Sequence, residues 1–134
     1  MEVKDLRIGN YISFNDIWCK VIEIDKDRVL VEYHNGETDY CYIDYIEPIE
    51  ITGDILIKTG CFKRYLNDIY SMTLCVGYYD YYISYQNVKD NKYSFVASGY
   101  KNDELKRKIV LDNIKYLHEL QNIFFYFTNQ ELKL

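Results

Sequence analysis

The sequence predicts an α+β fold in which a small N-terminal β-barrel leads through a short helix into an antiparallel sheet and a C-terminal helix. Short runs of β-branched and aromatic residues, separated by Asn, Asp and Gly, fill the first 50 residues, and a second set of runs follows a short helical segment. Apolar residues near the C-terminus recur at helical spacing. The length of 134 residues predicts a single domain over residues 1–134, with subregions at 1–50 and 51–134.

Strands are expected where an alternating run lies between two turn signals. In the first subregion these are Tyr11–Phe14, Ile17–Asp25, Arg28–His34 and Glu37–Tyr42. Asn and Asp residues between the first three runs supply the turns, because both residue types tolerate the backbone conformations that tight turns require.

The dipeptide Asn35-Gly36 predicts a two-residue type I′ hairpin, since both central residues of that turn need positive φ. This turn places Val31 opposite Tyr40 and Val29 opposite Tyr42. The valines and tyrosines are then expected on one face, where β-branched and aromatic pairs stabilise a sheet.

Short antiparallel strands with a Gly-containing turn before the first strand are typical of SH3-like small barrels. The segment Ile8-Gly9-Asn10-Tyr11-Ile12 stands where many such barrels carry their opening turn and first strand. Residues 1–50 are therefore interpreted as an SH3-like β subregion, a likeness of fold that implies no ligand.

Residues 51–134 are expected to form an α+β subregion that begins after Pro48, which cannot donate a hydrogen bond to a ladder. Thr52 is a candidate N-cap for a helix over Gly53–Thr59. The next expected elements are strands at Ile69–Val76, Tyr78–Val88 and Lys92–Ala97 and a polar loop over Ser98–Glu104.

The C-terminal helix is expected from about Asn113 to Phe127, with Asp112 or Asn113 as its cap. Asn129 is expected just past its end, because Asn tolerates the left-handed conformation there. The preceding segment Lys108–Leu111 is compatible with a strand or with an early helical turn.

Charge and patterning exclude several classes of protein. The net charge of −5 argues against a general nucleic-acid binder, which needs a basic face. No apolar run approaches the roughly 20 residues of a membrane-spanning helix, so no membrane partner is predicted. The segment Met1–Asp5 is charged and lacks the apolar stretch of a signal peptide, which predicts a cytoplasmic location.

No catalytic residue, metal site or cofactor is predicted. The four cysteines lie far apart without a C-x-x-C pair, so they are expected to be reduced and to pack as small apolar residues. The sequence contains no phosphate-binding loop, dinucleotide fingerprint or nucleophile elbow. A thiol or metal hydrolase therefore lacks its motif, and Lys106–Lys108 is interpreted as the solvated start of a helix.

The segment from Tyr78 to Tyr85 is unusually rich in tyrosine. On a strand, Tyr79, Tyr81 and Tyr85 share one face. They are candidate binding residues, as a stacking platform for bases or as a protein-binding patch. The alternative is that this face is the interior of a sheet built from Tyr.

The C-terminal helix carries polar residues where a purely structural helix rarely needs them: His118, Gln121 and Asn122. These are the second set of candidate binding residues. They are expected either to bond the adjoining sheet or to meet a second copy of the helix, so a homo-oligomer is one possible partner state.

Six short sequence segments together carry a resemblance to a known family. They are Asp5–Tyr11, Ile46–Thr52, Ile55–Phe62, Ile114–Asn122, Phe124–Thr128 and the pair Glu131-Leu132. With them the chain resembles a family of small uncharacterised proteins from Bacteroidetes phages and mobile elements. The resemblance implies an origin in such an element and action in a bacterial host cytoplasm, and it implies no activity or catalytic residue.

Together these observations predict a non-catalytic accessory protein, encoded by a phage or mobile element, that binds a host or phage protein, with host takeover or anti-defence as its role. The first alternative is a binder of a small nucleotide signal, which would stack the base on Tyr and hold phosphate with Arg or Lys. Further alternatives are a nucleic-acid-associated adaptor, which fits a small barrel but not the charge, and a virion component.

Overall fold

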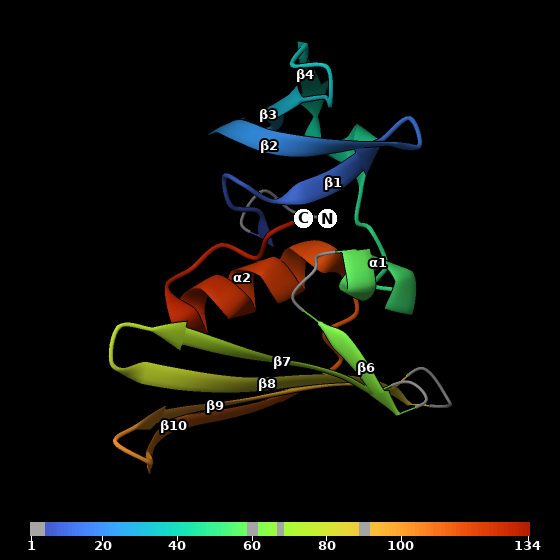
Figure 1. Cartoon of the computed structure of the whole chain (residues 1–134). Helices are drawn as coiled ribbons and strands as arrows, with labels where there is room; N and C mark the ends of the chain where they lie inside the picture. The colour runs from blue at the N-terminus through green and yellow to red at the C-terminus, as the bar shows by residue number, and fades with distance from the viewer. Residues whose placement is uncertain (1–4, 59–61, 67–68, 89–91) are drawn as a thin grey trace. The chain divides into compact units, whose positions relative to one another are not determined.

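The computed structural model describes residues 5–58, 62–66, 69–88 and 92–134 (Figure 1). These residues form two five-stranded antiparallel sheets and two α-helices, which makes the fold α+β. The chain divides into unit 1, Met1–Glu50 with Tyr116–Ile123, and unit 2, Ile51–Lys115 with Phe124–Leu134.

Unit 1 contains β1 (Tyr11–Phe14), β2 (Ile17–Asp25), β3 (Arg28–Glu32), β4 (Thr38–Tyr42), the 3-10 turn η2 (Ile43–Tyr45) and β5 (Ile46–Glu47). The strand order is β4-β3-β2-β1-β5. The predicted strands at residues 11–14 and 17–25 are confirmed. One face of the sheet builds the core from Leu6, Ile12, Cys19, Val21, Val29, Val31, Cys41 and Ile46.

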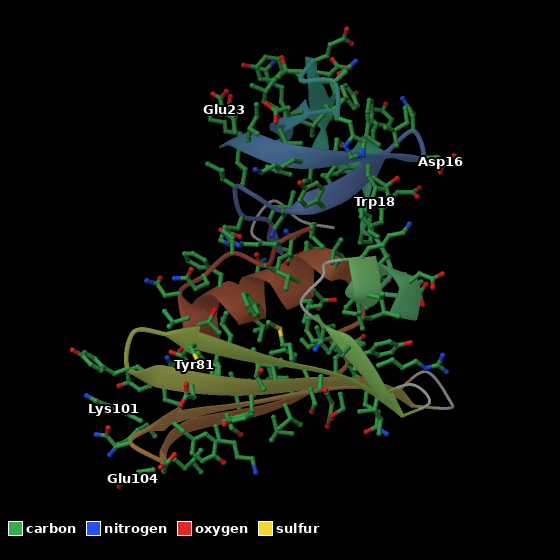
Figure 2. The ribbon with its side chains drawn as sticks, viewed as in Figure 1. Asp16, Trp18, Glu23, Tyr81, Lys101 and Glu104 are labelled. Atoms are coloured by element: carbon green, nitrogen blue, oxygen red, sulfur yellow. The ribbon has the colours of Figure 1, made fainter. Side chains whose placement is uncertain are left out.

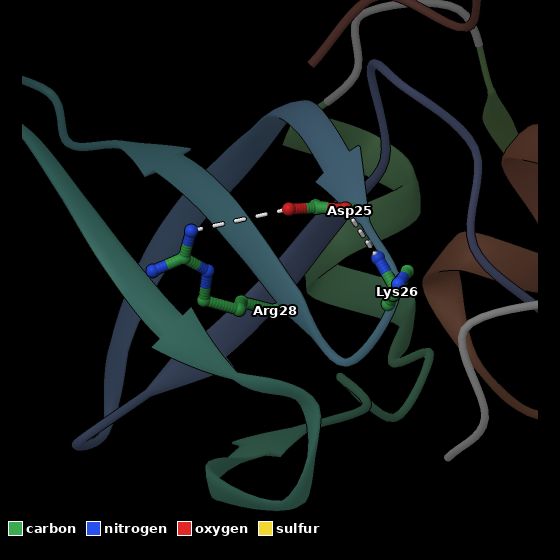
Figure 3. Close-up of polar contacts among 3 residues, drawn as sticks. All are labelled: Asp25, Lys26 and Arg28. Atoms are coloured by element: carbon green, nitrogen blue, oxygen red, sulfur yellow. Dashed lines mark hydrogen bonds and ion pairs between the residues drawn. The ribbon is translucent and has the colours of Figure 1, made fainter.

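The first two hairpins of unit 1 close through short polar turns. Asn15 and Asp16 have φ values of 51° and 62°, which is the type I′ conformation that a two-residue hairpin prefers. At the β2–β3 turn, the Asp25 carboxylate accepts a 2.8 Å hydrogen bond from the Lys26 backbone N–H and lies 3.9 Å from the Arg28 guanidinium (Figure 3). This exposed carboxylate fixes the turn.

The predicted type I′ turn at Asn35-Gly36 is wrong. Of these two residues only Gly36 has positive φ, at 84°. Its N–H donates to the Tyr33 carbonyl at 3.0 Å, and the Tyr33 N–H donates to the Glu37 carbonyl at 2.9 Å. The loop therefore has three residues and ends in a left-handed glycine, the other common hairpin closure.

The longer loop shifts the β3–β4 register by one residue. Val31 lies opposite Asp39, and not opposite Tyr40 as predicted. A shift of one residue turns every side chain of a strand to the other face. Cys41 is consequently buried in the core, whereas Tyr40 and Tyr42 are exposed.

Unit 2 contains the short helix α1 (Gly53–Lys58) and the strands β6 (Lys63–Leu66), β7 (Ile69–Val76), β8 (Tyr79–Val88), β9 (Lys92–Lys101) and β10 (Glu104–Asp112), in the order β10-β9-β8-β7-β6. The Thr52 hydroxyl accepts a 3.3 Å bond from the Ile55 N–H, which confirms the predicted cap. The predicted helix end at Thr59 and Gly60 lies outside the described residues.

The polar loop predicted over Ser98–Glu104 is wrong, because β9 continues to Lys101 and β10 begins at Glu104. The turn between them is Asn102-Asp103, with φ values of 54° and 60°. Polar residues here build a hairpin of the same kind as Asn15-Asp16. Lys106–Lys108 consequently lies in a strand and does not start a helix, and the strand alternative for Lys108–Leu111 is confirmed.

Helix α2 (Leu117–Thr128) contributes its first residues to unit 1 and its last to unit 2. It begins later than predicted, because Asn113 has a left-handed φ of 67°. The Tyr116 N–H is instead capped by the Glu119 carboxylate at 3.1 Å, as in a capping box. The predicted left-handed Asn129 is confirmed, with φ of 58°.

We expect Tyr85→Phe to lower the free energy of unfolding by about 1–2 kcal/mol, because a buried acceptor loses its partner. The Tyr85 hydroxyl donates a buried 2.6 Å hydrogen bond to the Ile114 carbonyl. Urea denaturation measures the change. Tyr82→Phe, on the exposed face of the same strand, is the matched control and is expected to leave stability unchanged.

Candidate binding site

The structure separates the three candidate tyrosines of β8 by burial. Tyr81 and Tyr85 are buried, and Tyr79 is half-buried. The Tyr81 ring meets Phe127 edge to face at 5.4 Å and stacks beside Tyr79 at 6.0 Å (Figure 2 labels Tyr81). A Cβ atom added at Gly99 would lie 3.0 Å from this ring, so the glycine makes room for it. These contacts favour the interpretation that the tyrosine face is the interior of the sheet.

Gln121 bonds the segment that enters β1. Its Oε1 accepts a 2.8 Å bond from the Tyr11 N–H, and its Nε2 donates a 3.1 Å bond to the Gly9 carbonyl. The side chain is 1 % exposed. Both ends of this amide are therefore used within unit 1.

Asn122 bonds the same segment. Its Oδ1 accepts from the Asn10 side-chain amide at 2.8 Å and from the Arg7 Nε at 3.2 Å, and its Nδ2 donates to the Asp5 carbonyl at 3.3 Å. Of the two roles expected for these amides, bonding to the adjoining sheet segment is the one observed. Contact with a second copy stays a prediction.

His118, the third candidate on α2, is buried and stacks on Tyr116 at 6.1 Å. Among the described residues, no hydrogen-bond partner lies at its Nδ1. Burial lowers the pKa of His118, and the nearby charges of Glu119 and Asp5 oppose that shift. The neutral imidazole is thus the form that the folded state favours.

A pocket of about 200 Å³, the Trp18 pocket, opens on unit 1, and its lining includes none of the six candidate residues. Its lining residues are Tyr11, Trp18, Cys19, Lys20, Glu32, Tyr33 and His34. Tyr11 lies opposite Lys20, and Lys20 lies opposite Glu32, so one row crosses β1, β2 and β3. Trp18, which is labelled in Figure 2, precedes Lys20 by two residues and therefore shares its face of the sheet.

Two half-exposed aromatic rings form the apolar part of this pocket. Tyr11 and Trp18 have ring centroids 6.5 Å apart at an interplanar angle of 50°. Lys20, Glu32 and His34 place charged and polar groups beside them. Sequence reasoning missed this site. The available signal was Trp18, the single tryptophan of the chain, two residues after a tight turn and on the face opposite to buried Cys19.

The one thiol that lines the pocket is a poor nucleophile. This thiol, Cys19, is buried, and desolvation raises its pKa to about 11. Such a thiol carries almost no thiolate near neutral pH. Among the described residues, no group of three or more His, Cys, Asp and Glu side chains is placed to hold a metal ion.

Comparison of the chain with protein-family models, curated proteins and solved structures finds no match. Within the described part of the chain, no helix has the length and apolarity that crossing a membrane would require.

We expect Gln121→Ala to destabilise the protein by about 2–4 kcal/mol, because two backbone groups at Gly9 and Tyr11 lose their partner. Chemical denaturation measures the loss. Gln130→Ala, which removes an exposed amide just past α2, is the control and is expected to change stability little. Equal stability of the two variants would contradict the role given to Gln121.

Stability is expected to fall as the pH drops from 7.5 to 5.5. The pKa of His118 is lower in the folded state than its ordinary value of 6.5, so the unfolded chain binds a proton that the folded chain resists. His118→Gln should flatten this dependence, as measured by urea denaturation across the range. His34→Gln, at the exposed histidine, should retain it.

Proposed function

We propose that the protein is a non-catalytic binding protein that engages a partner protein through the Trp18 pocket of unit 1. The observation that carries this proposal is the pair of half-exposed rings, Tyr11 and Trp18, beside the cross-strand charges Lys20 and Glu32. Trp and Tyr dominate the binding energy of protein interfaces when polar groups surround them.

The sheet of unit 1 supports the proposed binding role of the Trp18 pocket. The strand order β4-β3-β2-β1-β5 and the 3-10 turn before β5 support an SH3-like description of unit 1, as the sequence predicts. The pocket spans three of its strands, which hold the rings in place before a partner arrives. Preorganised aromatic anchors lose little conformational entropy on binding.

A bacterial host protein is the proposed partner class. This rests on the resemblance to proteins of Bacteroidetes phages and mobile elements, which implies action in a host cytoplasm. The pocket carries both signs of charge, in Lys20 and Glu32, and such a pair orients a protein partner more than it adds affinity. Host takeover or anti-defence are the roles this partner class would serve.

A small nucleotide is the second candidate ligand. Lys20 lies in the same pocket as the two rings, so a base stacked on Trp18 would have a cationic group near its phosphate. Trp18 is the only tryptophan, so its fluorescence reports directly on this pocket. Quenching by a nucleotide with saturation would favour this candidate over a protein partner.

Trp18→Ala is expected to abolish retention of the partner in affinity capture from a Bacteroidetes lysate, with at least tenfold less of one host polypeptide recovered. The physical reason is that truncating a central Trp commonly costs about 2 kcal/mol or more of binding free energy. Quantitative mass spectrometry of the captured proteins measures it.

Tyr42→Ala is the matched control, because Tyr42 is an exposed aromatic on β4 of the same unit and lies outside the pocket. A Glu32→Lys variant tests the pocket without removing a ring. The proposal is contradicted if wild type, Trp18→Ala and Glu32→Lys retain the same amount of the captured polypeptide.

A further inference from the structure

A second hollow, of about 330 Å³, lies on unit 2 and is independent of the Trp18 pocket. It is lined by Asp80 and Tyr82 of β8, Tyr100 of β9 and Asp103 of the β9–β10 turn. Asp80 lies directly opposite Tyr100 in the sheet register. Because strand side chains alternate, Asp80, Tyr82 and Tyr100 occupy the face opposite to buried Tyr81.

Two aromatic rings form the walls of this hollow. Tyr82 and Tyr100 meet edge to face, with centroids 5.5 Å apart and an interplanar angle of 84°. Tyr82 is 51 % exposed, so much of its ring is open to solvent. The face of an aromatic ring is negative and attracts a cation placed over it.

Two carboxylates border the rings. Asp80 accepts a 2.9 Å hydrogen bond from the Cys75 thiol, a neutral donor that leaves the negative charge in place. The nearest lysines in the sequence are directed elsewhere. Lys101 Nζ lies 5.8 Å from the ring centre of Tyr79, and Lys106 pairs with Glu104 at 3.1 Å.

We infer that this hollow binds an alkylammonium cation, with the ammonium group between Asp80 and Asp103 and its methylene groups against Tyr82 and Tyr100. Two carboxylates with aromatic walls suit an organic cation better than Mg²⁺ or Ca²⁺. A metal ion needs several oxygen ligands and gains nothing from ring faces. A free polyamine and a lysine side chain offer the same chemistry.

The test is an amide NMR titration of the full chain at low ionic strength with two probes, spermidine and a blocked Gly-Lys-Gly peptide. We expect saturable shifts at Asp80, Tyr82, Tyr100 and the Asn102-Asp103 turn. Saturation by spermidine alone assigns the site to free polyamines. Saturation by both probes assigns it to any alkylammonium group, a lysine side chain included.

The double variant Asp80→Asn, Asp103→Asn is expected to weaken spermidine binding by about tenfold or more, since both charges adjoin the ammonium group. Asn keeps the acceptor for Cys75 at position 80 and tolerates the left-handed backbone at position 103, so the fold is retained. Tyr82→Leu should weaken binding by about two- to fivefold.

Asp112→Asn on β10 and Tyr78→Ala in the β7–β8 turn are the controls, because each removes the same kind of group from an exposed position of unit 2 outside the hollow. Both are expected to bind spermidine as wild type does. The inference is overturned if the double Asn variant binds as tightly as Asp112→Asn. It is also overturned if spermidine shifts the amide signals near every exposed carboxylate to the same extent.

Discussion

The buried side-chain amide of Gln121 is the contact on which the architecture of unit 1 depends. Strand β1 begins two residues after Gly9, which has a φ of 100°, and the backbone groups at this entry need partners. Gln121 supplies one donor and one acceptor to Gly9 and Tyr11 from 110 or more residues away. Since Tyr11 also lines the Trp18 pocket, the same amide anchors the backbone from which one aromatic ring of the candidate site extends.

Turn chemistry explains which strands the sequence predicts correctly and which it does not. Asn15-Asp16 adopts two positive φ values and closes the β1–β2 hairpin at the predicted turn. The Asn35-Gly36 dipeptide is compatible with two closures, and one residue of loop length decides which face Tyr40 and Tyr42 occupy. The choice is made by the core, which accepts Cys41 beside Val29.

The tyrosine-rich strand shows a second limit of sequence reasoning. Alternation predicts that Tyr79, Tyr81 and Tyr85 share a face, but both faces of β8 carry tyrosines, so composition cannot say which is interior. Phe127 decides it by covering Tyr81. The hollow lined by Tyr82 and Tyr100 is the consequence, because the opposite face stays exposed. The residues that line this hollow come from β8, β9 and the β9–β10 turn. The sequence predicts only one strand and a polar loop for these residues.

The basic residues of β10 affect the charge around the hollow lined by Tyr82 and Tyr100, and two of them contact other residues of unit 2. A β-bulge between Leu105 and Arg107 shifts the register of the strand, and the Arg107 guanidinium donates a 3.0 Å bond to the Phe127 carbonyl and lies 4.8 Å from the Phe127 ring. Arg107 thereby serves the end of α2, as cations at a helix C-terminus commonly do. Lys106 pairs with Glu104, so Lys106 and Arg107 of this basic run both contact other residues of unit 2. Asp80 and Asp103 are the charged residues that line the hollow beside the exposed rings, and for this reason a cation suits the hollow better than a phosphate.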